Sequence, residues 1–95
     1  MKGGSQAAFF VRALRVYILY SPSRDRYYVG HAEDPDLRLT RDHNGRRNAS
    51  TRPGVPWEHK WSRWFATRRE AMAFEKVIKS RKSRVYIESL IQQAG

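Results

Sequence analysis

Two phenols in neighbouring strand-like runs are the first groups in this sequence that could do chemistry together. Tyr17 lies in the run 15–20 and Tyr28 in the run 27–30, and both runs are rich in β-branched and aromatic residues. The Pro, Ser and Asp residues between them predict a hairpin whose turn covers residues 21–24, which places Tyr17 opposite Tyr28. Cross-strand partners lie about 4.5–5.5 Å apart at Cβ, so both hydroxyls could reach one reacting group. The alternative interpretation is that both tyrosines are half-buried packing residues, which are common in strands.

A carboxylate at the border of a buried helix face is the next candidate. Residues 68–80 are predicted to form a helix, with Thr67 as its cap and Glu70 completing a capping box. The core-facing stripe of this helix comprises Ala71, Phe74, Val77 and Ile78. Glu75 lies beside that stripe, so its carboxylate must be paired, hydrogen-bonded or bound to a cation to offset its desolvation. An i,i+4 salt bridge to Lys79 and a bound metal ion are the two alternatives.

The chain carries a large positive charge for its size. Nineteen Lys and Arg residues against nine Asp and Glu residues give a formal net charge of +10 on 95 residues. The cations fall into two clusters with aromatic residues nearby in the sequence, a pattern that suits a phosphate backbone. The first cluster comprises Arg38, Arg41, Arg46, Arg47 and Arg52, and the second Lys76, Lys79, Arg81, Lys82 and Arg84. The predicted nucleic-acid-binding residues among them are Arg41, Arg46, Arg47, Arg52, Lys79 and Lys82.

A basic surface also suits roles without nucleic acid, which this sequence favours less. A basic face that only solvates the protein is one alternative. A membrane-surface role is another, but neither cluster has the continuous apolar face that an interfacial helix needs. There is no cysteine, so no disulfide partner is expected, and no uncharged stretch has membrane-spanning length. We therefore expect a cytoplasmic protein without a membrane partner, whose oligomeric state the sequence leaves undetermined.

The elements that must position these groups form one small domain. We expect a flexible leader over residues 1–11 and a single domain over residues 12–95, because a chain of this length holds one modest core. After the hairpin, Asp34 and Pro35 begin a short helix that ends at Asn44-Gly45. A polar loop, a third strand and a final helix are predicted over residues 45–56, 57–65 and 83–93, with Val85, Tyr86, Leu90 and one of Ile87 or Ile91 packing inward. The predicted fold class is α+β, with a three-stranded antiparallel-type sheet flanked by helices in the order β-β-α-β-α-α.

A series of short motifs runs in a fixed order along most of the chain. It begins with Arg15-Val16-Tyr17 and Tyr28-Val29-Gly30. It continues with Gly30-His31-Ala32, Leu37-Arg38-Leu39, His43-Asn44-Gly45, Ser50-Thr51-Arg52, Pro56-Trp57, Glu70-Ala71, Glu75, Ile78-Lys79, Lys82-Ser83-Arg84 and Tyr86-Ile87-Glu88. The first two motifs resemble the paired signature of the GIY-YIG endonuclease superfamily, and the whole series is similar to its small stand-alone bacterial members. One three-residue match would be weak, whereas an ordered series over roughly residues 16–91 is specific.

The resemblance implies a metal-dependent endonuclease that hydrolyses phosphodiester bonds in DNA, with RNA as an alternative substrate and DNA repair as a setting. It implies that Glu75 holds one divalent metal, Mg²⁺ or another such as Mn²⁺, with water and phosphate completing the coordination. Tyr17 would orient or deprotonate the attacking water, and Tyr28 would support it by hydrogen bonding. Arg38 would brace the scissile phosphate through its planar guanidinium.

The position of the histidine departs from the family pattern. The family usually carries His or Tyr four residues after the arginine, whereas here Asp42 holds that position and His43 comes five residues after Arg38. Five residues turn a regular helix by about 500°, which would point His43 about 140° away from Arg38. Either the helix loosens before Asn44, or the proton-transfer role belongs elsewhere. His31, directly after the signature glycine, is the other candidate for that role, and each histidine could instead be structural.

Two interpretations without catalysis compete with the nuclease. One is a nucleic-acid-binding module of the same fold whose chemistry has decayed, and the other is a structural adaptor in a ribonucleoprotein. The joint presence of Tyr17, Tyr28, Arg38 and Glu75 favours the enzyme. A module that only binds has no reason to keep an acidic residue facing a phosphate.

Overall fold

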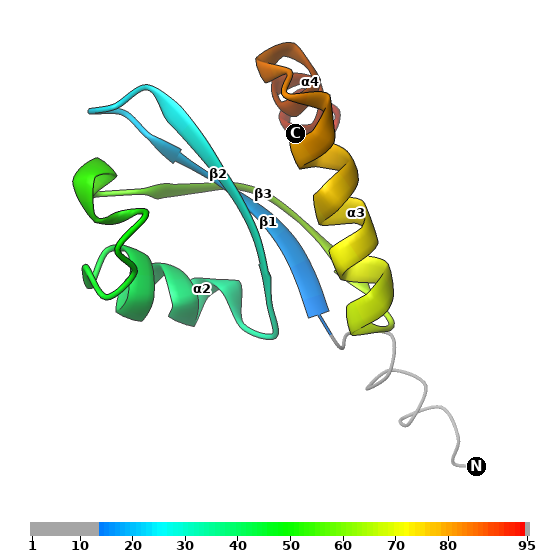
Figure 1. The fold of residues 1–95 in the computed structure, drawn as a ribbon, viewed down its shortest axis with the longest axis horizontal. Coiled ribbons are helices and arrows are strands. Elements are labelled where there is room, and N and C mark those ends of the chain that lie inside the picture. The colour runs from blue at the N-terminus through cyan, green and yellow to red at the C-terminus, as the bar shows by residue number, and fades with distance from the viewer. Residues whose placement is uncertain (1–13, 95) are drawn as a thin grey trace.

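The fold is a three-stranded sheet with helices on both faces (Figure 1). A computed structural model describes residues 14–94, so the predicted leader lies outside the described residues. The elements in chain order are β1 (Leu14–Ser21), β2 (Arg26–Ala32), α2 (Pro35–Leu37), η1 (Arg38–His43), η2 (Arg52–Gly54), β3 (Glu58–Phe65), α3 (Arg68–Arg81) and α4 (Arg84–Ala94). The predicted α+β class and the order β-β-α-β-α-α are confirmed.

The sheet is antiparallel, with β1 between β2 and β3. The predicted register is wrong by two residues, because Tyr17 pairs with Gly30 and Leu19 pairs with Tyr28. Strand pairing continues to Ser21 and Arg26, and the chain reverses between them with Asp25 at φ 53°, a conformation that Asp tolerates better than most residues. A two-residue shift keeps every side chain on its face, so Tyr17 and Tyr28 still share one face of the sheet.

Each face of the sheet has its own hydrophobic core. Helices α3 and α4 cover one face, and the segment from α2 to η1 lies over the other (Figure 1). The core beneath α3 and α4 contains Leu14, Val16, Ile18, Val29, Trp61, Ala71, Ile78 and Leu90. The opposite core contains Tyr17, Leu19, Ala32 and Trp57. The sheet therefore separates two packed layers.

Helix α3 begins where the sequence predicts, because the backbone N–H of Glu70 donates to Oγ1 of Thr67 at 3.2 Å. The prediction that Val77 and Val85 pack inward is wrong, because Val77 is 41% exposed and Val85 is 77% exposed. The buried stripe of α3 follows Ala71 and Ile78, and Val77 is rotated away from it. Helix α4 packs through Leu90 and its i,i+3 and i,i+4 neighbours, whose stripe does not include Val85.

Candidate active site

The first cluster of predicted site residues is a buried pair beneath Tyr28. The hydroxyl of Tyr17 lies 2.9 Å from Nε2 of His43, and both side chains are fully buried. Tyr28 is half-buried and covers them, with its ring centroid 6.3 Å from that of Tyr17 and 4.9 Å from that of His43. Gly30 makes this arrangement fit, because a Cβ there would lie 2.8 Å from the Tyr17 hydroxyl. Tyr28, and not Tyr17, is thus the phenol that reaches the surface.

A local change of helix type brings His43 to Tyr17. The segment begins as predicted, with the N–H of Leu37 donating to Oδ1 of Asp34 at 3.1 Å. From Arg38 to His43 it is a π-helix, and the N–H of Asn44 donates to the carbonyl of Leu39, five residues back, at 2.7 Å. The wider turn accommodates one extra residue. The predicted alternative of a loosened helix is therefore the one that occurs.

A hydroxyl holds the other side of the His43 ring. Nδ1 of His43 lies 2.9 Å from Oγ1 of Thr51, which is itself fully buried. Burial, followed by the charge of Arg38, lowers the pKa of His43 below its ordinary value, so the imidazole is neutral at neutral pH. Burial also raises the pKa of Tyr17, although the charge of Arg38 opposes this, so the phenol keeps its proton. Thr51 belongs to the series of motifs in the sequence but received no role there, because only the fold shows which hydroxyl in a polar loop meets a ring.

The second cluster joins α3 to the edge strand. Nδ1 of His31 lies 2.5 Å from Oε1 of Glu75, and Nζ of Lys79 lies 2.6 Å from Oε2. Burial tends to raise the pKa of Glu75, but hydrogen bonds from Lys79 and His31 outweigh it and lower the pKa below its ordinary value. The predicted salt bridge between Glu75 and Lys79 is confirmed, and the carboxylate is ionised. Arg68, whose Nη1 lies 3.4 Å from Nε2 of His31, is a neighbour that sequence reasoning missed.

Arg38 lies on η1 with an acidic partner. Its Nε is 2.9 Å from Oδ2 of Asp42, and Nε of Arg41 is 2.9 Å from Oδ1 of the same carboxylate. Arg38 also lines a hollow of about 340 Å³ together with His31 and Arg68. Arg38, the first residue of the first cationic cluster, therefore shares a hollow with His31, the residue after Gly30.

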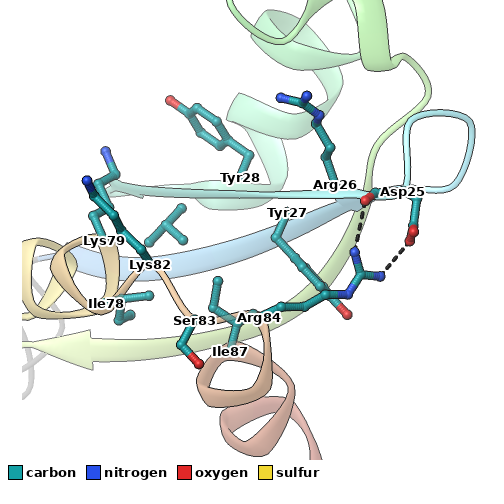
Figure 2. A pocket seen from close by; sticks show the side chains of 11 residues that line it. Asp25, Arg26, Tyr27, Tyr28, Ile78, Lys79, Lys82, Ser83, Arg84 and Ile87 are labelled. Carbon is teal, nitrogen blue, oxygen red and sulfur yellow. Dashed lines mark hydrogen bonds and ion pairs between the residues drawn. The ribbon is translucent and has the colours of Figure 1, made fainter.

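A larger hollow lies between β2 and the junction of α3 and α4. It has a volume of about 560 Å³, and Tyr28, Lys79 and Lys82 are among its lining residues. Figure 2 shows Tyr28 on the opposite side of β2 from Tyr27. It also shows Arg84 hydrogen-bonded to Asp25, at the end of the hollow away from Lys79. A third hollow, lined by His31, Glu75 and Lys79, lies alongside.

The predicted catalytic groups surround one strand but do not line one cavity. Tyr28 and Lys79 line the hollow of about 560 Å³. Lys79 also lines the hollow that contains Glu75 and His31, and His31 lines the hollow of about 340 Å³ that contains Arg38. These groups thus border a row of hollows around β2. The predicted nucleic-acid-binding residues Arg41, Arg46, Arg47, Arg52, Lys79 and Lys82 are all exposed.

The residues at this edge fit a hydrated divalent cation rather than an enclosed metal centre. Within residues 14–94, no group of three or more His, Cys, Asp or Glu side chains could hold a metal ion. Glu75 supplies one ionised carboxylate, the hard oxygen donor that Mg²⁺ accepts while keeping several waters.

No helix in the described part of the chain is long and apolar enough to cross a membrane.

The class of this domain follows from comparison with known families, which supports a nuclease-type domain. The GIY-YIG catalytic domain matches residues 14–87, and the chain therefore belongs to the GIY-YIG family. Membership makes nucleic acid the class of substrate. Comparison with curated proteins and with solved structures gives no match.

Proposed function

We propose that this protein is a divalent-metal-dependent endonuclease that hydrolyses phosphodiester bonds in DNA at the edge of β2. The observation that carries the proposal is the position of Glu75. Its carboxylate is held against His31, and Lys79 connects it to the hollow that Tyr28 also lines. Burial disfavours the charge of Glu75, and hydrogen bonds from Lys79 and His31 keep it ionised, so this carboxylate already lies in surroundings that hold cations next to it.

Each side chain takes one role in this proposal. A divalent cation bound by Glu75 would supply charge neutralisation at the phosphate and polarise a water. Tyr28, the accessible phenol, orients the attacking water or the phosphate by hydrogen bonding. Arg38 exchanges Asp42 for a phosphate oxygen, because its ion pair with Asp42 leaves Nε without a hydrogen bond, whereas the planar guanidinium can hydrogen-bond a phosphate.

Tyr17 and His43 act from behind Tyr28. Sequence reasoning gave Tyr17 the contact with water, but its hydroxyl is buried and bonded to His43, so we assign that contact to Tyr28. The buried pair fixes the ring of Tyr28 by packing and sets the polarity of the site. His31 orients Glu75, which makes it a positioning residue for the carboxylate.

A nucleic-acid-binding module without catalysis is the second candidate. The specific observation in its favour is that both oxygens of Glu75 already have partners, His31 and Lys79. In that case the carboxylate would only hold α3 to β2. The cationic surface would then serve binding alone.

Nicking of supercoiled plasmid in Mg²⁺ separates the two candidates. Glu75→Gln should reduce the rate by about a hundredfold or more, the order expected when charge stabilisation is removed from a transition state. Glu58→Gln, which removes an equal charge from the exposed start of β3, should leave the rate unchanged. Binding of a labelled duplex should be similar in all three proteins. Equal nicking by Glu75→Gln would point to a contaminating nuclease, and binding without nicking by any protein would favour the binding module.

A further inference from the structure

The directions of the hydrogen bonds around His43 can be deduced from its neighbours. His43 contacts two hydroxyls, Tyr17 at Nε2 and Thr51 at Nδ1, each at 2.9 Å. A neutral imidazole has one N–H and one lone pair, so one hydroxyl must donate to it and the other must accept from it. Hydroxyls can do either, and the decision therefore rests on a third partner.

The third partner is the backbone carbonyl of Asn48. Oγ1 of Thr51 lies 3.3 Å from this oxygen, and a carbonyl only accepts. The Thr51 proton therefore points to Asn48, and Oγ1 accepts from Nδ1–H of His43. Nε2 is then the unprotonated nitrogen, and it accepts the proton of Tyr17. In this arrangement all three hydrogen bonds are made, the two to His43 being buried.

The opposite arrangement leaves a buried donor without an acceptor. If Thr51 donated to Nδ1, then Nε2–H would donate to Tyr17, and the phenolic proton would need another acceptor. Among the described residues, His43 Nε2 is the only hydrogen-bond partner found for the Tyr17 hydroxyl. Buried donors without partners are rare in folded proteins, so this tautomer is disfavoured.

We propose that Thr51 is a positioning residue that fixes His43 in the Nδ1–H tautomer, so that Nε2 accepts the phenolic proton of Tyr17. The consequence for catalysis rests on the proposed nuclease function. With its proton directed to His43, the buried Tyr17 hydroxyl turns its lone pairs towards Gly30 and Tyr28, which pack closely around it. The buried pair thus has a fixed polarity behind Tyr28, the phenol to which we assign the contact with water.

The loop also holds Thr51 in place independently of His43. The backbone carbonyl of Thr51 accepts from the indole N–H of Trp57 at 2.7 Å, and the Thr51 N–H donates to the carbonyl of Asn48 at 3.2 Å. The hydroxyl is thus presented to His43 by a fixed backbone. Removal of the hydroxyl alone should leave this loop intact.

The tautomer can be read directly from the nitrogen resonances of ¹⁵N-histidine-labelled full-length protein at neutral pH. Wild-type His43 should show a protonated Nδ1 and an unprotonated Nε2. Thr51→Val should shift His43 towards Nε2–H, whereas Thr51→Ser should keep Nδ1–H. Thr40→Val, which makes the same chemical change at an exposed position on η1, is the matched control and should have no effect. Tyr17→Phe should also keep Nδ1–H, because Thr51 sets the tautomer.

Kinetics give a second measurement on the same variants. Thr51→Val should lower kcat roughly tenfold to a hundredfold with KM unchanged, the range found when an outer partner that orients a functional histidine is removed. Thr51→Ser should restore kcat. A wild-type His43 protonated at Nε2, or a Thr51→Val protein that keeps Nδ1–H, would overturn the inference. A wild type with the expected tautomer but without cleavage would instead refute the nuclease function. The wild-type spectrum decides the tautomer even if Thr51→Val does not fold.

Discussion

Nδ1 of His31 lies 2.5 Å from Oε1 of Glu75, and this contact joins β2 to α3 across 44 positions of sequence. On the other side of the ring, Nη1 of Arg68 faces Nε2 at 3.4 Å. A guanidinium only donates, so Nε2 of His31 is the acceptor. Nδ1 of His31 therefore carries the N–H, which donates a hydrogen bond to Glu75. With Lys79 on Oε2, both oxygens of Glu75 have partners, and a divalent cation must compete with the Lys79 ammonium.

Lys79→Gln should therefore strengthen divalent-ion binding at Glu75. The side chain of Lys79 is 54% exposed, and an exposed i,i+4 pair contributes about 0.3–0.5 kcal/mol, so we expect about a twofold gain in affinity. Titration with Mn²⁺, followed by paramagnetic broadening of resonances near Glu75, measures it. Lys76→Gln removes the same charge from a nearby exposed position and should change the affinity less. Equal effects of the two substitutions would mean that only net charge matters.

Asp42→Asn should strengthen nucleic-acid binding by releasing Arg38. The Asp42 carboxylate contacts Arg38 and Arg41 and competes with a phosphate for both. A partly exposed pair of this kind contributes about 1 kcal/mol, so we expect a gain of about twofold to fivefold. Fluorescence anisotropy with a labelled oligonucleotide, in a Glu75→Gln background that prevents cleavage, measures the change. Asp36→Asn makes the same charge change on an exposed residue of α2, and a gain as large in that variant would contradict the role given to Arg38.

Local signals in the sequence predicted the elements of this fold well. The Thr67 cap, the Asp34 cap and the turn between β1 and β2 depend on residues within a few positions of one another. Such contacts do not depend on the rest of the chain, so patterns of residue types suffice to predict them. The faces of Tyr17 and Tyr28 also follow locally, from the two-residue period of a strand.

What the sequence could not predict depends on tertiary contacts. The observed hairpin register differs from the predicted one by two residues. A turn over residues 21–24 and one over residues 22–25 both leave the same side chains on each face of the sheet, so the alternation of residue types cannot distinguish them. The π-turn at Arg38 to His43 has no composition signal of its own; the spacing of five residues left a loosened helix as one of two alternatives, and only the contact of His43 with Tyr17 decides between them. Thr51 becomes a candidate only because a ring nitrogen lies next to its hydroxyl in the folded chain.

Gly30→Ala should destabilise the protein through Tyr17. A Cβ at Gly30 would lie 2.8 Å from the Tyr17 hydroxyl and 2.9 Å from Cζ, and the buried ring cannot move away without disturbing His43. Overpacking of this kind costs about 1–3 kcal/mol, which urea unfolding measures. Tyr17→Phe removes one of the two close atoms, so the double variant should be less destabilised than the sum of the single ones. Additive effects would show that the clash is relieved elsewhere.

The pH dependence of stability should report the buried His43. Burial, and then Arg38, lowers its pKa in the folded protein below the ordinary value of about 6.5. As pH falls below about 6.5, the unfolded chain takes up a proton at this position while the folded protein does not, so the free energy of unfolding decreases. The contribution of neutral His43 to the free energy of unfolding is thus fully present above about pH 6.5 and is lost as the pH falls through the lowered pKa of the folded protein.

His43→Gln isolates that contribution. The unfolding free energy of the wild type should fall with decreasing pH more steeply than that of the variant, by at most about 1.4 kcal/mol per pH unit for one proton. Other groups with lowered pKa values, including Glu75 and His59, titrate in both proteins and cancel in the difference. Urea unfolding of both proteins over the range from about pH 5 to about pH 8 gives the two slopes. Parallel curves would mean that His43 binds its proton equally well in the folded and unfolded chain, contrary to its burial.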